Sequence, residues 1–121
     1  MGVSAVAPVA LVVEGDDMQR EMVATLLEES EFSVIQCENA EAAVSVLKKM
    51  GAHVAVMLTD VNLAGQVDGM QLAYFAHQNY PNIHVIVTSA DALTKKLPEG
   101  VTFMPKPWVA LELLRHAVRS Q

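Results

Sequence analysis

The chain has 121 residues, the size of one domain, and 52% of them are hydrophobic, enough to fill a core. Its net charge of −6 argues against nucleic-acid binding, because neutralising phosphates requires clustered Lys and Arg. No apolar run approaches the roughly 18 residues that a membrane span needs. Cys37 is the single cysteine, which excludes an internal disulfide and favours a reducing, cytoplasmic location.

Short apolar segments and amphipathic segments alternate along the chain. The apolar patterns predict strands over residues 9–13, 32–37, 53–60, 83–90 and 101–106. Helical spacing predicts helices over residues 17–30, 39–51, from 68 up to Pro81, and over 108–121. Asp17 and Asn39 are candidate N-caps of the first two helices. The methionines are expected to fill gaps in the core: Met18, Met22, Met50, Met57 and Met70.

The nearly all-apolar strands predict a parallel sheet that helices cover on both faces. With right-handed crossovers, this gives an α/β doubly wound three-layer sandwich around a five-stranded sheet. We expect residues 1–121 to form a single domain, because no linker, repeat or low-complexity segment interrupts the pattern.

Polar residues stand where the expected strands end. Glu14 and Asp16 follow the first strand, Asp60 ends the third, Thr88 comes near the end of the fourth, and Lys106 ends the fifth. Binding sites of such sheets gather outside the carboxyl ends of the strands, so these side chains are expected to converge at one edge. Each residue alone has an ordinary structural explanation, but carboxylates, a hydroxyl and an ammonium at the ends of four strands are an uncommon combination.

Four stretches carry a specific resemblance: "VVEGDDMQR", "VMLTDVNLAGQVDGMQLA", "VIVTSA" and "MPKPW". Together they resemble the response-regulator receiver domain of two-component signalling, over essentially the whole chain. The resemblance implies a flavodoxin-like fold that takes a phosphoryl group from a sensor histidine kinase or a histidine phosphotransfer protein. It also implies a downstream protein target, and that the domain is not itself an enzyme, although it can assist the transfer and hydrolysis of its own phosphoryl group.

The resemblance assigns roles to individual residues. It implies that Asp60 is the phosphoacceptor, that the Thr88 hydroxyl and Lys106 bind the phosphoryl group, and that Phe103 is a switch aromatic. The bond between Lys106 and Pro107 is a candidate cis peptide. An alternative for Phe103 is a purely structural place in the core.

The metal site departs from the family pattern. Receiver domains bind Mg²⁺ next to two adjacent acids after the first strand, and here the second of these positions is Gly15. The expected ligands are Glu14, Asp16, Asp60 and the backbone carbonyl of Asn62. Either Gly15 lets Asp16 swing into the pocket, or Glu14 reaches the cation with water filling the gap, or metal binding is lost. We expect weakened but working Mg²⁺ binding.

A second departure is the short segment "SADALTKKLPEG" between the fourth and fifth strands. Family members fit a two-turn helix and a connector here, so a shortened fourth helix of one or two turns, or a loop, is expected. Many receivers signal and dimerise through this face, so the shortening suggests an altered partner surface or a different mode of homodimer. The alternative is a loop that was shortened without any effect on partners.

Three functions are compatible with the sequence. The favoured one is a phosphoacceptor receiver, either standing alone or cut from a hybrid kinase. The alternative is a phosphorylation-independent pseudo-receiver, a binding module with an impaired metal site. A flavodoxin-like nucleotide-binding enzyme is the weakest, because "EGDD" is too acidic and has too few glycines to cradle a phosphate.

Overall fold

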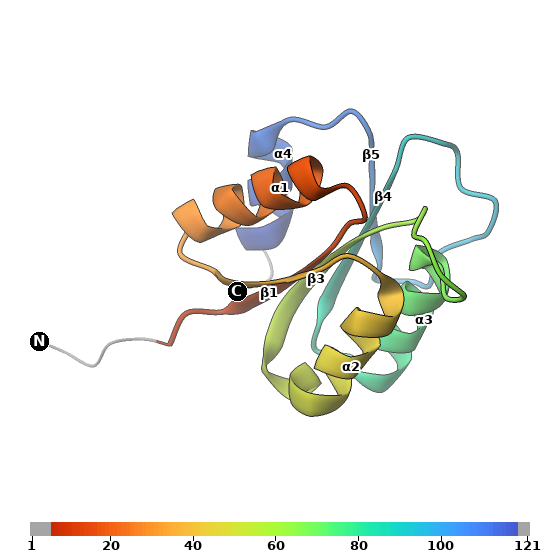
Figure 1. Cartoon of the computed structure of the whole chain (residues 1–121), viewed down its shortest axis with the longest axis horizontal. Helices are drawn as coiled ribbons and strands as arrows, with labels where there is room; N and C mark the ends of the chain where they lie inside the picture. Colours follow the sequence, from red (N-terminus) through yellow and green to blue (C-terminus); the bar gives the residue numbers. More distant parts are fainter. Residues whose placement is uncertain (1–5, 119–121) are drawn as a thin grey trace, which may run out of the picture.

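The computed structural model describes residues 6–118 as a doubly wound α/β sandwich (Figure 1). Five parallel strands form one sheet in the order β2-β1-β3-β4-β5. The strands are β1 (Val9–Val13), β2 (Ser33–Cys37), β3 (Val54–Asp60), β4 (His84–Ser89) and β5 (Thr102–Pro105). The helices are α1 (Asp17–Glu29), α2 (Ala40–Met50), α3 (Gly69–Asn79) and α4 (Ala110–Val118), and a short 3-10 turn, η1 (Gly51–His53), leads into β3. The predicted fold class is confirmed.

The helices cover both faces of the sheet. Helices α1 and α4 lie on one face, and α2 and α3 lie on the other (Figure 1). Alternate strand residues feed the two cores: Leu11 and Met57 face α2 and α3, whereas Val12 and Leu58 face α1 and α4. This alternation follows from the two-residue period of a strand, and it explains why the strand sequences are apolar throughout.

Helices α1, α2 and α3 begin at side-chain caps. Asn39 caps α2 as predicted, since its side chain accepts a hydrogen bond from the N–H of Ala42. The predicted cap of α1 was wrong by one residue: Asp16, not Asp17, is extended and accepts from the N–H of Gln19 at 2.9 Å. Asp17 is the first helical residue, where its charge favours the helix N-terminus instead.

The five methionines predicted to fill the core differ in burial, and Met50 is half-buried. Met57 and Met70 are buried as predicted, but Met18 and Met22 on α1 are 84% and 52% exposed. Helix α1 turns Val23, Ala24 and Leu27 onto the sheet, which leaves its methionines on the outward side. The placement predicted for these two methionines was therefore wrong, and α1 presents an apolar stripe to solvent.

The segment between β4 and β5 is a loop, the second of the two forms expected from the sequence. Within residues 90–101, which we call the β4–β5 loop, the structure contains no helix. The loop extends past the end of α3 (Figure 1), and the Tyr74 hydroxyl of α3 donates a hydrogen bond to the Lys96 carbonyl. The predicted closing helix begins two residues late, at Ala110, and residues 119–121 of the prediction lie outside the described part.

Across residues 6–118, none of the helices is both long enough and apolar enough to span a bilayer.

Candidate functional site

The polar residues at the strand ends come together as expected at one edge of the sheet. Asp60 and Thr88 are direct neighbours in the β3–β4 register, and Glu14 follows the last residue of β1. All three are buried, with 9% of Glu14, 7% of Asp60 and 3% of Thr88 exposed. Two carboxylates and a hydroxyl are thus held on rigid elements where few water molecules reach them.

The Lys106 ammonium connects the carboxylates. Its Nζ donates to Asp60 Oδ2 at 2.9 Å and to Glu14 Oε1 at 3.2 Å. A third hydrogen bond goes to Gln19 Oε1, from the first turn of α1, at 3.0 Å. An ammonium has three N–H donors, so this set satisfies all of them. The Lys106–Pro107 peptide bond that follows is cis, as predicted.

The carboxylates keep Lys106 charged. Burial alone would lower the pKa of Lys106, but the hydrogen bonds and charges of Asp60 and Glu14 outweigh it and raise the pKa above its ordinary value. Lys106 is therefore a fixed cation beside Asp60 at any physiological pH.

The loop after β3 holds the other side of Asp60. Asp60 Oδ1 accepts from the backbone N–H of Asn62 at 3.1 Å, so each carboxylate oxygen has a partner. The N–H of Gly69 donates to the Val61 carbonyl at 3.0 Å and draws the start of α3 against the strand end. A Cβ atom at Gly69 would lie 1.8 Å from the Asp60 carbonyl oxygen, so only glycine allows this approach.

The segment after β1 is fixed by Glu14 and Arg20. Glu14 Oε2 accepts from the backbone N–H of Asp16 at 3.0 Å, and the Arg20 guanidinium donates to the Glu14 carbonyl at 2.8 Å. Asp16 is exposed and caps α1, and Gly15 between them is exposed too. Glu14 is therefore the acid of this segment that reaches Asp60 through Lys106.

The site offers oxygen ligands of the kind that Mg²⁺ prefers, from Glu14, Asp60 and the Asn62 carbonyl. Among residues 6–118, however, no group of three or more His, Cys, Asp or Glu side chains is placed to hold a metal ion. The residue types present are ones that bind Mg²⁺, but fewer carboxylates lie together at the site than the sequence led us to expect. The role of Asp16 as a metal ligand stays a prediction.

Two aromatic residues, Trp108 and Phe103, lie on opposite faces of the sheet. The Trp108 indole N–H donates to Thr88 Oγ1 at 3.2 Å, and the ring packs on the core beneath α1 and α4. Phe103 is half-buried and packs on the core beneath α2 and α3. The switch role of Phe103 stays a prediction.

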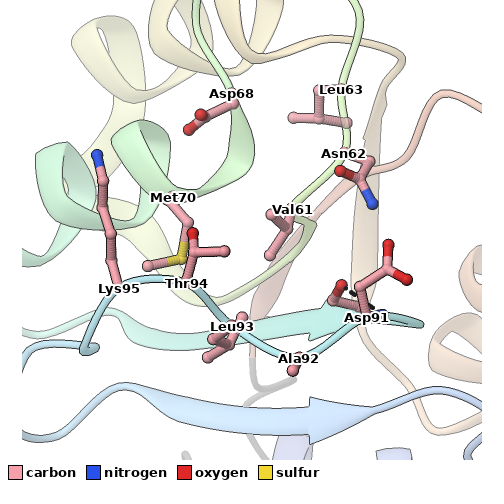
Figure 2. A pocket seen from close by; sticks show the side chains of 11 residues that line it. Val61, Asn62, Leu63, Asp68, Met70, Asp91, Ala92, Leu93, Thr94 and Lys95 are labelled. Carbon is pink, nitrogen blue, oxygen red and sulfur yellow. Dashed lines mark hydrogen bonds between the residues drawn. The ribbon is translucent and has the colours of Figure 1, made fainter.

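A cavity of about 550 Å³ opens beside the site, between the loop after β3 and the β4–β5 loop (Figure 2). Asn62 from the first loop and Asp91 from the second point toward one another across it (Figure 2). Ser89 Oγ accepts from the Asp91 N–H at 3.0 Å and so fixes the beginning of the β4–β5 loop. The cavity thus lies between Val61 and Asn62, which follow Asp60, and the β4–β5 loop.

Sequence reasoning missed four residues that shape the site. Gln19 and Arg20 act from the first turn of α1, Trp108 contacts Thr88, and Glu41 of α2 accepts from the N–H groups of Gln66 and Val67 in the loop after Asp60. None lies at the end of a strand, which was the signal used. Arg20, four residues after the N-cap Asp16, is the one of these four that sequence spacing could have indicated.

Comparison with known proteins gives a consistent result. A model of the response regulator receiver domain family matches residues 10–118. A cyclic di-GMP phosphodiesterase of Thermotoga maritima is 37% identical over 120 residues, covering 92% of this chain and 31% of that protein. A putative two-component response regulator of Arabidopsis thaliana, ARR21, is 29% identical over 102 residues, covering 80% of this chain and 16% of that protein.

The solved structures share the fold. A response regulator receiver protein from Sinorhizobium medicae superposes with a TM-score of 0.85 at 21% identity, covering 94% of each chain. The chain spans less than a third of the length of the curated relatives, so their whole-protein activities belong to larger proteins.

Proposed function

The chain belongs to the response regulator receiver domain family, and we propose that it accepts a phosphoryl group on Asp60 and thereby switches its contacts with other proteins. Receiver domains of two-component systems interact with histidine kinases and with downstream effectors. Under this proposal residues 1–121 work as one receiver domain, the donor is a sensor histidine kinase or a histidine phosphotransfer protein, and the location is cytoplasmic.

The observation that carries the proposal is the pairing of Asp60 with Lys106. Asp60 is buried at the end of a central strand, and a lysine held by three acceptors lies 2.9 Å from one of its oxygens. A carboxylate nucleophile needs such a fixed cation, because the incoming phosphoryl oxygens would otherwise repel it. A salt bridge made only for stability would gain little from three converging acceptors at the edge of the sheet.

The transfer follows from these positions. A carboxylate oxygen of Asp60 attacks the phosphorus as the bond from phosphorus to the donor imidazole nitrogen breaks, and the electron pair leaves on that nitrogen. Lys106 neutralises charge on the phosphoryl oxygens, and Thr88 can donate its hydroxyl proton to one of them. Glu14, Asp60 and the Asn62 carbonyl would hold Mg²⁺, which when bound offsets the repulsion between nucleophile and phosphoryl group.

We propose that Mg²⁺ binds more weakly here than an intact pair of acids would allow. Gly15 contributes no side chain, Asp16 is engaged as the cap of α1, and Glu14 is shared with Lys106. Metal entry therefore competes with the Lys106 ammonium for the Glu14 carboxylate.

The proposed docking face for the phosphohistidine donor is the outer side of α1. Met18 and Met22 are exposed there, and a groove of about 540 Å³ lined by Met22, Pro107 and Trp108 reaches Lys106. An apolar stripe beside the reacting carboxylate suits a partner that must bring its histidine close to Asp60. Under the same proposal, a homodimer would form through the face that carries the β4–β5 loop, away from the outer side of α1.

The test is the intact mass of the protein after incubation with acetyl phosphate, with and without Mg²⁺, beside the Asp60→Asn variant. We expect a phosphoryl adduct that depends on the metal and is absent from the variant. A folded wild-type protein that stays unmodified under acetyl phosphate and under phosphorylated histidine phosphotransfer proteins would refute the proposal.

The alternative function, a pseudo-receiver that binds partners without phosphorylation, is favoured by one observation. Lys106 already bridges the two buried carboxylates, and residues 6–118 gather no third acid at the site. That alternative predicts equal partner binding by the wild type and by Asp60→Asn, whereas the favoured function predicts that only the phosphorylated wild type changes its binding.

A further inference from the structure

The hydrogen bond between Trp108 and Thr88 has a direction that matters for the chemistry. An indole N–H can only donate, so in the 3.2 Å contact Thr88 Oγ1 is the acceptor. The hydroxyl proton of Thr88 is not used in this bond. Thr88 is 3% exposed and is the register neighbour of Asp60, so its rotation is confined to a narrow, buried space beside the carboxylate.

Trp108 is well placed to hold that hydroxyl. It follows the cis Lys106–Pro107 bond and precedes α4 (Ala110–Val118) by two residues. Its ring packs on the core that includes Leu113 and Ala117 of α4. A small cavity of about 20 Å³, lined among others by Trp108, Thr88, Lys106 and Asp60, lies between these side chains, so they face a common space.

We infer that Trp108 is the positioning residue of Thr88: it holds the hydroxyl oxygen in the unphosphorylated domain and loses it when Thr88 turns to donate to a phosphoryl oxygen on Asp60. This inference rests on the proposed function. It predicts that Trp108, on the face of α1 and α4, is the first aromatic residue to respond to phosphorylation. Phe103 lies on the opposite face of the sheet and packs on the core beneath α2 and α3. The freed indole then lets the segment from Pro107 to the start of α4 move.

The experiment uses the fact that Trp108 is the only tryptophan of the chain, so the isotope-labelled protein gives a single indole N–H signal in its NMR spectrum. Thr88→Val keeps the shape of the side chain and removes the hydroxyl acceptor. The indole signal of this variant therefore shows where the signal lies when the Trp108–Thr88 hydrogen bond is absent. Wild type, Thr88→Val and Asp60→Asn are compared before and after acetyl phosphate with Mg²⁺, and intact mass reports the fraction phosphorylated in each sample.

We expect the wild-type signal to lie away from that of Thr88→Val before phosphorylation and to move toward it in proportion to the phosphorylated fraction. Asp60→Asn should not move. In a Trp108→Phe variant compared with the wild type at equal phosphorylated fraction, as measured by intact mass, the amide signals of Ala110–Val118 should respond to the adduct at most half as much as in the wild type.

Each failure has a separate meaning. A phosphoryl adduct with an unmoved indole signal overturns the inference and leaves the proposed function intact. Identical indole positions in wild type and Thr88→Val also overturn it, because the bond would then be absent in solution. Absence of any adduct overturns the proposed function itself, and the inference falls with it.

Discussion

At the scale of single residues, Gly15 is the position where the acidic site is incomplete. The nearest atom to an added Cβ is the Glu38 carbonyl oxygen at 3.7 Å, an ordinary contact, so a side chain fits here without moving the backbone. The absence of an acid at this position is thus not imposed by steric crowding, and the site can be rebuilt by one substitution.

We predict that Gly15→Asp tightens Mg²⁺ binding by about tenfold or more. One carboxylate near a cation is worth several kcal/mol at a partly exposed site, and ~1.4 kcal/mol is tenfold in affinity. Trp108 fluorescence during a Mg²⁺ titration measures the change. Gly15→Ala is the matched control and should bind as the wild type does; equal affinity of all three would refute a weakened site.

Lys106 offers a second prediction at this scale. Lys106→Met removes the shared donor of Glu14 and Asp60 and leaves two buried carboxylates facing each other, which should lower the free energy of unfolding by about 2 kcal/mol at neutral pH. Urea unfolding of the wild type and the variant measures this change in the free energy of unfolding. The control is Lys95→Met, at an exposed position, which should change stability by less than about 0.5 kcal/mol. Equal stability of the two variants would contradict the role given to Lys106.

At the scale of elements, the approach of α3 to β3 depends on Gly69. Its added Cβ would overlap the Asp60 carbonyl, and backbone cannot yield as a flexible side chain can. Gly69→Ala should therefore cost about 1–3 kcal/mol of stability and should also slow phosphorylation, because Asp60 must shift. Urea unfolding and the acetyl phosphate reaction measure the two effects. Gly15→Ala serves again as the glycine control, and a Gly69→Ala protein with wild-type values would rule out the close approach.

The loop after β3 is tied to α2 by Glu41. Backbone N–H groups, first that of Glu41 itself and then those of Val67 and Gln66, hold the pKa of Glu41 below its ordinary value of 4.5. A group with a lowered folded-state pKa stabilises the fold above its unfolded pKa, and that contribution is lost as the pH falls through the folded value. The contact is thus fully present at neutral pH and disappears in acid.

We predict that amide exchange of Gln66 and Val67, corrected for intrinsic rates, speeds up in the wild type as the pH falls below 4.5. In Glu41→Gln it should be faster than in the wild type at neutral pH and should not change with pH, because a neutral amide oxygen accepts more weakly than a carboxylate. NMR-detected hydrogen exchange follows both amides, with Glu38→Gln as the control at a neighbouring exposed glutamate. Slow, pH-independent exchange in Glu41→Gln would show that the loop is held by other means.

The elements also show what a sequence can and cannot predict. Asp60, Thr88 and Lys106 could be placed together because strand ends share one edge of a parallel sheet, whatever the details of packing. Asp16 and Asp17 could not be separated as caps, since both are acids and the choice depends on one backbone turn. The contacts of Gln19 with Lys106 and of Trp108 with Thr88 were missed, because they depend on side-chain rotamers and on helix orientation, which the sequence spacing does not encode.

The wrong placement of Met18 and Met22 has a related cause. The apolar residues of α1 occupy more than one stripe, and a period of 3.6 identifies a face only when the other face is polar. The tertiary structure chooses Val23 and Leu27 for the core and leaves the methionines outside. An apolar excess on a surface helix is thus a sign of a partner, consistent with the docking face proposed for α1.

At the scale of the whole molecule, the two faces of the sheet are covered unequally near β5. The face of α2 and α3 lacks a helix between β4 and β5, where the β4–β5 loop runs instead (Figure 1). Ser89 fixes its beginning, and the Tyr74 hydroxyl holds it to α3 through the Lys96 carbonyl. Regions with few buried contacts open first, so this loop should be the least stable part of the structure between β1 and α4.

We predict that hydrogen exchange is faster in residues 90–101 than in any strand, and that Tyr74→Phe raises it there about fivefold, the equivalent of one lost hydrogen bond of ~1 kcal/mol. Tyr80→Phe is the control, since that ring packs on Phe75 and Gly51, away from the loop. Mass-detected exchange separates the loop from the strands. A loop as protected as β4, or one that is indifferent to Tyr74→Phe, would mean that its side chains pack into the neighbouring cavity and replace the missing helix.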